Sequence, residues 1–122
     1  MRYVYSKAHT FMCIGGGKTL QVGISDYAQQ KAGRIRSITL PYAGETIEKG
    51  EPFAEIDAVG GRIEVLAPAD AIITKVNLEL DGRPELLNRD TKKNWICEVE
   101  LRGPMPLELL SEERYLKFVQ TL

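Results

Sequence analysis

Short runs of alternating apolar and polar residues, each closed by glycine or proline, make up most of the chain. Thr10–Ile14 and Thr19–Ile24 flank the connector Gly15–Lys18. Glycine reaches positive φ without a steric penalty, so this stretch predicts a β-hairpin. The later strand-like runs are Ile35–Leu40, Phe53–Val59, Arg62–Leu66 and Ala71–Leu78. Many short strands with regular turns predict a mostly β fold of the sandwich or barrel type.

Two segments have the features of helices instead. Ser25 or its neighbour Asp26 can cap the start of a short helix, and Gly33 can end it. Near the end of the chain, Ser111 followed by Glu112–Glu113 is typical of a helix start, because acidic side chains stabilise the positive end of the helix dipole. The apolar residues with helical spacing there are Leu107, Leu110, Tyr115, Phe118 and Val119.

The tightest turn signal is Gly60-Gly61, which separates Glu55–Val59 from Arg62–Leu66. A two-residue glycine loop between two strands predicts a hairpin with a type I′ or II′ turn.

Composition narrows the class of protein. The 122 residues predict one domain, spanning residues 1–122. The chain has 16 Lys+Arg against 17 Asp+Glu, so it has no basic excess for a phosphate backbone and we expect no nucleic-acid partner. No apolar run approaches the length of about 18 residues that crosses a membrane, and Met1–Ser6 lacks the apolar core of a signal peptide. We therefore expect a cytoplasmic protein without a membrane partner.

Few residues are candidates for chemistry. Cys13 and Cys97 lie in separate strand-like runs and are expected to be buried, reduced thiols. Alternation places Cys97 on one face with Trp95, Val99 and Leu101. One histidine and two distant cysteines do not supply the four or so ligands of a zinc site, so no metal is expected. His9 is expected to be structural or solvated, and no serine or cysteine shows a recognisable histidine and carboxylate arrangement, so no catalytic residue is assigned.

Several short segments, taken together, resemble one known family. They occur in order with little change in spacing, and they are His9–Phe11, Val22–Gln29, Leu40–Pro41, Gly44–Phe53, Ala67–Pro68, Asn77, Pro84–Asn88, Trp95 and Leu109–Tyr115. In these segments the chain resembles the H protein of the glycine cleavage system, a lipoyl carrier, over about Tyr3 to Val119. The resemblance implies a lipoyl/biotinyl-type barrel-sandwich hybrid with two small sheets, short flanking helices and a C-terminal helix.

The resemblance also implies where the family carries its cofactor. A lysine at a hairpin tip holds lipoate by an amide bond, after an acidic-small-valine triplet and ahead of an Ala-Pro landmark. Here the triplet is Asp57–Val59 and the landmark is Ala67–Pro68, so the lysine position is Gly60. No lysine lies between residues 50 and 74, and the guanidinium of Arg62 is no ordinary acylation nucleophile. Neither lipoate nor biotin is expected, and the cofactor assignment is none.

A lysine introduced at position 60 is expected to have an effect that depends on the backbone angle. At negative φ it is expected to be tolerated and to raise the free energy of unfolding by about 0.4–1 kcal/mol, because it restricts the unfolded chain. At positive φ it is expected to lower the free energy of unfolding by about 1 kcal/mol, because a side chain disfavours that backbone conformation.

Two functions remain open from the sequence. The first is an H-protein-like module without lipoate, which acts as a non-catalytic protein-binding or scaffold domain. Its tip, formed by Asp57, Val59, Gly60, Gly61 and Arg62, would face the partner, possible partners being components of glycine cleavage or of a lipoate pathway. The alternative is a functional H-protein-type carrier in glycine cleavage or a related lipoate-linked pathway, with an attachment point that the sequence does not identify.

Overall fold

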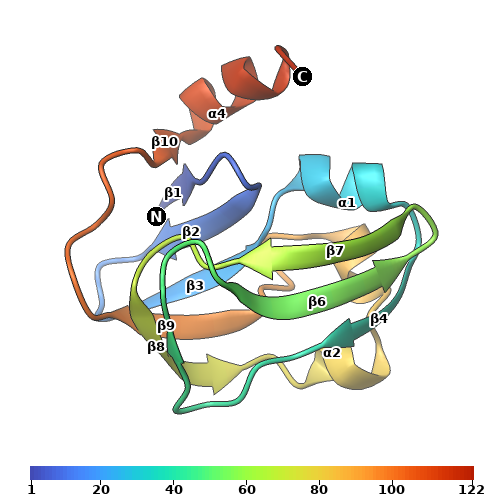
Figure 1. Cartoon of the computed structure of the whole chain (residues 1–122), viewed down its shortest axis with the longest axis horizontal. Coiled ribbons are helices and arrows are strands. Elements are labelled where there is room, and N and C mark those ends of the chain that lie inside the picture. Colours follow the sequence, from blue (N-terminus) through green and yellow to red (C-terminus); the bar gives the residue numbers. More distant parts are fainter.

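Two antiparallel β-sheets form the body of the protein (Figure 1), as described for all 122 residues by a computed structural model. The larger sheet has seven strands in the order β10-β1-β2-β3-β9-β8-β5, and the smaller sheet has three in the order β4-β6-β7. The strands are β1 (Arg2–Tyr5), β2 (Thr10–Ile14), β3 (Thr19–Ile24), β4 (Ile35–Thr39), β5 (Thr46–Ile47), β6 (Pro52–Ala58), β7 (Gly61–Leu66), β8 (Ala71–Val76), β9 (Cys97–Leu101) and β10 (Leu110–Ser111).

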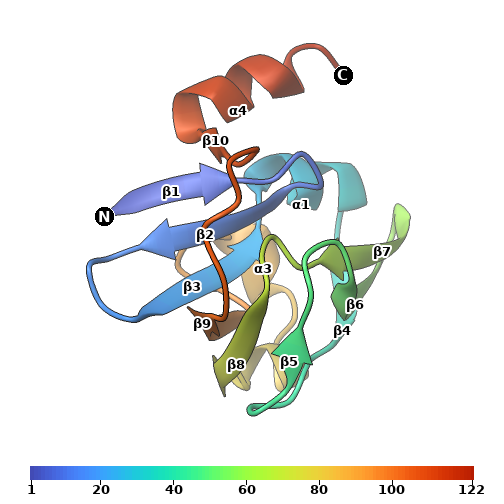
Figure 2. The ribbon, with the colours of Figure 1, turned by 60° about the vertical axis from the view of Figure 1, so that its left-hand side comes forward.

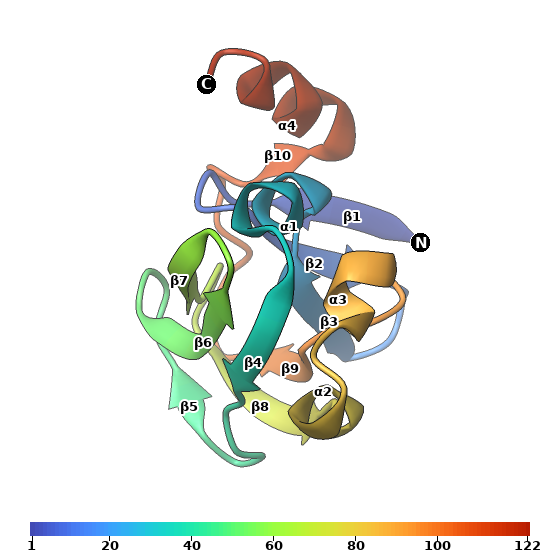
Figure 3. The ribbon, with the colours of Figure 1, turned by 90° about the vertical axis from the view of Figure 1, so that its right-hand side faces the viewer.

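Four helices accompany the sheets. They are α1 (Asp26–Ala32), α2 (Glu79–Gly82), α3 (Leu86–Arg89) and α4 (Glu112–Val119). Figure 3 looks onto the end of the molecule where α1, α2 and α3 lie, whereas α4 packs apart from them beside β1. The fold is mostly β, with short flanking helices and a C-terminal helix, and it is the barrel-sandwich hybrid that the resemblance implied.

The main hydrophobic core lies between the two sheets and is closed by α2 and α3. Fully buried side chains reach it from the larger sheet (Met12, Ile73), from the smaller sheet (Ile56) and from the helices (Leu80, Leu87). Burying a large aliphatic side chain stabilises a fold by roughly 1.5–3 kcal/mol, so this layer holds the two sheets together.

The early elements form as the sequence predicts, since their signals are local. β2 and β3 pair around the glycine connector, and the side chain of Ser25 caps α1 by accepting from the amide of Ala28 at 3.2 Å. Gly33 ends α1 at φ 75°, a backbone conformation that glycine adopts without strain. Ser111 likewise caps α4 by accepting from the amide of Arg114.

Three details of the sequence prediction were wrong. The run Ala71–Leu78 ends as a strand at Val76, and Leu78 instead precedes α2 with 73% of its surface exposed. Leu107 and Leu110 do not belong to the C-terminal helix: Leu107 is 99% exposed and Leu110 lies in β10. Trp95 precedes β9 and packs on the outer face of the larger sheet, while Cys97 and Val99 face the main core.

Both cysteines are buried and unpaired, in agreement with the sequence prediction. Burial raises the pKa of the Cys97 thiol to about 12, so this group is held in its neutral form. No helix of the protein is both long enough and apolar enough to span a bilayer.

A second, smaller cluster joins α4 to the outer face of the larger sheet (Figure 2). Its buried members are Tyr5, Phe11, Cys13 and Tyr115, and the rings of Tyr5 and Tyr115 stack with centroids 4.4 Å apart. Lys92 and Tyr5 both donate to the Glu112 carboxylate at the start of α4, and these bonds lower the pKa of that carboxyl. The C-terminal helix is therefore attached by aromatic packing and one shared carboxylate.

His9 takes part in this attachment. It has φ 71°, a left-handed conformation in which histidine is enriched among non-glycine residues. Its Nδ1 lies 2.7 Å from the Tyr115 hydroxyl, which in turn lies 2.6 Å from the buried Ser25 hydroxyl. Partial burial lowers the pKa of His9 below its ordinary value of 6.5. His9 thus has a structural role in the fold, as the sequence analysis expects.

We predict that this histidine makes stability depend on pH. The unfolded chain takes up a proton at a higher pH than the folded chain, so the free energy of unfolding falls as pH drops through about 6.5 and levels off below the folded pKa. Urea denaturation across this range measures the step. His9→Asn removes the only histidine and tolerates the same backbone conformation, so its profile is expected to be flat there. An equal step in the variant would show that another group is responsible.

Candidate functional site

The residues proposed for the tip come together on one hairpin. In the β6–β7 register, Asp57 lies opposite Arg62 and Ala58 lies opposite Gly61. Val59 and Gly60 therefore form the two-residue turn, and the five predicted residues lie at the end of the hairpin beside α1 (Figure 1).

The predicted turn type was wrong, because the turn is displaced by one residue. Gly61 belongs to β7 and has φ 123°, whereas neither Val59 nor Gly60 has positive φ. Type I′ and II′ turns require positive φ at the first central residue, which here is Val59. The two glycines are thus needed for different reasons: Gly61 for its backbone angle and Gly60 for space.

The turn is held by the segment that follows α1. The amide of Val59 donates to the carbonyl of Arg34 at 2.9 Å, and the amide of Gly60 donates to the carbonyl of Ala32 at 2.7 Å. We call Ala32–Ile35 the seat segment. Both bonds join backbone groups, so the tip is fixed to the seat segment without any side chain.

Gly60 lies too close to the seat segment to have a side chain in this conformation. A Cβ built on Gly60 would lie 2.7 Å from the Ala32 carbonyl oxygen and 2.8 Å from that of Lys31. Both contacts are to backbone atoms, which cannot rotate away as a flexible side chain can. The expectation that a lysine here is tolerated or stabilising at negative φ was therefore wrong. The backbone angle permits the substitution, but the space does not.

Asn88 holds the seat segment in place, a role that its neighbours in the sequence do not indicate. Its Oδ1 accepts from the amide of Ile35 at 2.9 Å, while its Nδ2 donates to the carbonyl of Gly33 and to the side chain of Gln29. Asn88 and Gln29 both fall in segments that carry the family resemblance. That was the only sequence signal for this contact, since the two residues are far apart in the chain.

The outer surface of the tip is small and open. Val59 is 59% exposed at the end of the hairpin. Arg62 pairs with Glu55 at 3.3 Å instead of its cross-strand neighbour Asp57, and both members of that pair are well exposed. Exposed ion pairs contribute little to stability, so Arg62 is available to other partners. The tip offers apolar, charged and backbone contacts and no nucleophile.

The two cysteines lie in different hydrophobic clusters. Cys13 lies in the second cluster and Cys97 in the main core. No group of three or more His, Cys, Asp or Glu residues has an arrangement that could hold a metal ion.

Comparisons with known proteins agree with this architecture. The family described as glycine cleavage H-protein matches residues 3–122. The chain is 38% identical to the glycine cleavage system H protein of Alkaliphilus oremlandii over 118 residues, covering 96% of this chain and 92% of that one. It is also 38% identical to the H protein of Xanthobacter autotrophicus over 120 residues, covering 97% and 95%. The crystal structure of an H protein from Mycobacterium marinum has a TM-score of 0.88 at 24% identity, covering 98% of this chain and 97% of that one.

The fold and the hairpin are those of a lipoyl-type domain. Within that class, the match over nearly the full chain shows that this protein belongs to the glycine cleavage H-protein family.

We predict that Gly60→Ala destabilises the protein through its contact with the seat segment. A single added methyl group meets two carbonyl oxygens, and such overpacking costs typically about 1–3 kcal/mol. Chemical denaturation of both proteins measures the difference.

Gly17→Ala is the matched control. Gly17 lies in the exposed β2–β3 connector, has no positive φ, and a Cβ there would meet nothing within 4 Å. Its effect is expected to stay within about 0.5 kcal/mol. Equal stability changes in the two variants would contradict the close packing of the tip.

Proposed function

We propose that this protein is an H-protein-like module, spanning residues 1–122, that carries no lipoyl group and acts by binding other proteins. One observation carries the proposal: at Gly60, the position that the resemblance implies for the lipoyl-lysine, a Cβ would lie 2.7 Å and 2.8 Å from two backbone carbonyl oxygens. An amide-linked cofactor needs an amine, and position 60 has neither the amine nor the space for its side chain.

Loss of the attachment point removes the chemistry that a carrier supplies. A tethered group meets successive partners at a high effective concentration, and this advantage disappears without the tether. The module is non-catalytic in this proposal, because the tip holds no nucleophile. What remains is a rigid surface with the overall shape of the family.

The tip is the proposed partner-facing surface, and it comprises Asp57, Val59, Gly60, Gly61 and Arg62. Arginine is enriched at protein interfaces, and Arg62 lies on the same hairpin end as the exposed Val59. The proposed partners are proteins that recognise the H-protein shape, such as components of glycine cleavage or of a lipoate pathway. A cytoplasmic location is part of the proposal, and it is supported by the two buried, unpaired thiols.

Family membership supports one alternative, a functional carrier with a different attachment point. Lys31 is the residue to consider, because its carbonyl lies beside Gly60. Its Nζ, however, lies 5.7 Å from the centre of the Tyr27 ring on the same helix. No other feature marks this lysine as a modification site.

We predict that the purified protein has its unmodified mass after co-expression with a lipoate ligase and ample lipoate. Intact mass spectrometry makes the measurement, with a lipoylatable carrier domain in the same cells as the positive control. A stoichiometric lipoyl mass on any lysine would overturn the proposal, and Lys31→Arg would then show whether Lys31 is the site.

We also predict that the protein does not replace a lipoylated H protein in glycine–bicarbonate exchange with the decarboxylase component. The expected rate equals that of the reaction without H protein. Exchange above that background, dependent on this protein, would support the carrier alternative.

A further inference from the structure

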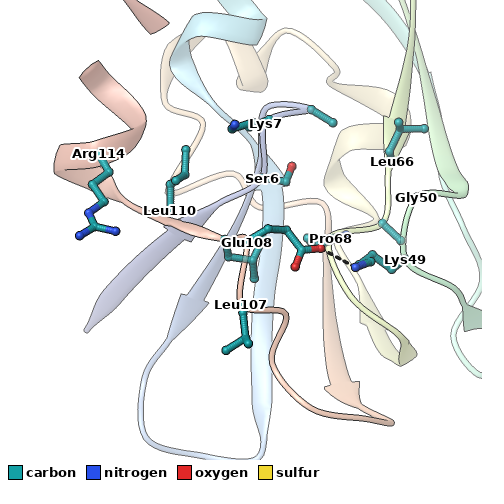
Figure 4. Close-up of a pocket in the computed structure, with 13 residues that line it drawn as sticks. Ser6, Lys7, Lys49, Gly50, Leu66, Pro68, Leu107, Glu108, Leu110 and Arg114 are labelled. Atoms are coloured by element: carbon teal, nitrogen blue, oxygen red, sulfur yellow. Dashed lines mark hydrogen bonds and ion pairs between the residues drawn. The ribbon is translucent and has the colours of Figure 1, made fainter. Parts of the chain in front are cut away.

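An open cavity of ≈ 430 Å³ lies away from the tip, on the side of the molecule where the segment before α4 passes the β1–β2 turn (Figure 4). It is also bordered by the Lys49–Gly50 turn and by the residues that end β7. Its volume falls within the range of small-molecule sites in proteins. Nothing in the proposed function uses it.

One part of the lining is apolar. Leu66, Ala67 and Pro68 form one wall, and Ala67 and Pro68 are buried. Leu109 and Leu110 contribute from the segment before α4. An unbranched apolar group placed here would leave water on contact with these side chains, which favours binding.

The charged residues of the lining are mostly basic. Lys7, Lys49 and Arg114 border the cavity, and Glu108 is the only acidic residue among the lining residues. Lys49 donates to Glu108, and this hydrogen bond lowers the pKa of the Glu108 carboxyl, so these two charges neutralise each other. Lys7 and Arg114 form no ion pair in the protein, although the Lys7 Nζ lies 5.4 Å from the centre of the Phe118 ring.

The two unpaired cations lie toward the same side of the cavity. Figure 4 shows Arg114 on α4 and the amine end of Lys7 on the side of α4, whereas Leu66, Pro68 and the Lys49–Glu108 pair lie toward the opposite side. The Ser6 hydroxyl lies near Lys7 in the same view and accepts from the Thr10 amide at 3.2 Å, which leaves its own O–H to donate. The cavity therefore combines the apolar wall of Leu66–Pro68 with two cations that form no ion pair.

We propose that this cavity binds a small amphipathic anion. Its head group, a carboxylate or a phosphate, binds beside Lys7, Arg114 and the Ser6 hydroxyl. Its short apolar body lies against Leu66–Pro68. Guanidinium and ammonium groups bind both kinds of head group, so the shared feature is one anionic head on an unbranched apolar chain.

Octanoate is the probe, titrated into ¹⁵N-labelled protein and followed by amide chemical shifts. The expected dissociation constant is about 1 mM or tighter, which is reasonable for a ligand of this size. Shifts are expected at the cavity residues, and affinity is expected to fall with salt because the charges are exposed. Hexanoate is expected to bind more weakly, by about fourfold for each methylene that no longer enters the cavity. Octyl phosphate in a parallel titration ranks the two head groups.

Two molecules that each lack one part of octanoate test the anion-binding and the apolar parts of the site separately. Octanol lacks the anion and acetate lacks the apolar chain, and each is expected to bind at least tenfold more weakly than octanoate. Equal binding of octanol would overturn the proposal, because the cations would then play no part.

Three variants locate the site. Arg114→Gln is expected to weaken octanoate binding about tenfold, since it removes one charge-assisted contact. Lys117→Gln is the matched control on the same helix, because Lys117 pairs with Glu113 and does not line the cavity, and its affinity is expected to be unchanged. Ala8→Phe fills the cavity from an exposed turn, so binding is expected to be lost while the far-UV circular dichroism stays native.

The proposal is wrong if octanoate gives no saturable shifts in the native protein, or if Ala8→Phe binds as well as the native chain. Equal weakening by Arg114→Gln and Lys117→Gln would also overturn it, since it would indicate unspecific attraction to the helix. None of these results depends on whether the protein is lipoylated, so they test the cavity separately from the proposed function.

Discussion

The contact between the β6–β7 turn and the backbone that follows α1 determines what the hairpin can do. It consists of two amide-to-carbonyl hydrogen bonds, from Val59 to Arg34 and from Gly60 to Ala32. Backbone donors that leave water need partners, and these two find theirs more than 20 residues earlier in the chain. The contact brings the turn so close to the seat segment that no side chain fits at Gly60. One packing constraint therefore determines both the geometry of the hairpin and the lack of room for a side chain at position 60.

The conformation of the seat segment depends on one of its own residues and on one residue from α3. Gly33 supplies the left-handed conformation that turns the chain out of α1, and Asn88 fixes the peptide groups on either side of Arg34. Polar groups that leave water need hydrogen-bond partners, and the partly buried Asn88 pairs both its oxygen and its nitrogen. Truncation of Asn88 would leave the Ile35 amide without its partner. The resulting shift of the seat segment would be transmitted to the tip through the backbone hydrogen bonds. The conformation of the tip therefore depends on Asn88, a polar residue in α3.

The sequence predicted those parts of the fold whose signals are local. The β2–β3 hairpin has a glycine connector, and α1 has a serine cap and a terminal glycine, so each was identifiable from a few neighbouring residues. The four-residue helices α2 and α3 are too short to show a helical period, and β10 is a two-residue bridge that exists through its pairing with β1. The resemblance implies that Gly60 is the lipoyl-lysine position, and this assignment stays a prediction. The displaced turn was not predictable from the sequence. Its hydrogen bonds to the seat segment, which lies more than 20 residues earlier in the chain, overrode the preference of two adjacent glycines for the centre of a turn.

The elements that pack in the two hydrophobic clusters differ in the free energy of their local unfolding. The main core has contributions from both sheets and from α2 and α3, whereas α4 is attached through the small cluster around Tyr115. Local opening follows the density of buried contacts, so amide hydrogens of α4 should exchange with solvent at a lower free-energy cost than those of β2 or β9. Opening of α4 would uncover Tyr5 and Phe11 while the two sheets stay packed. The outer aromatic face of the larger sheet would then become accessible to solvent without global unfolding.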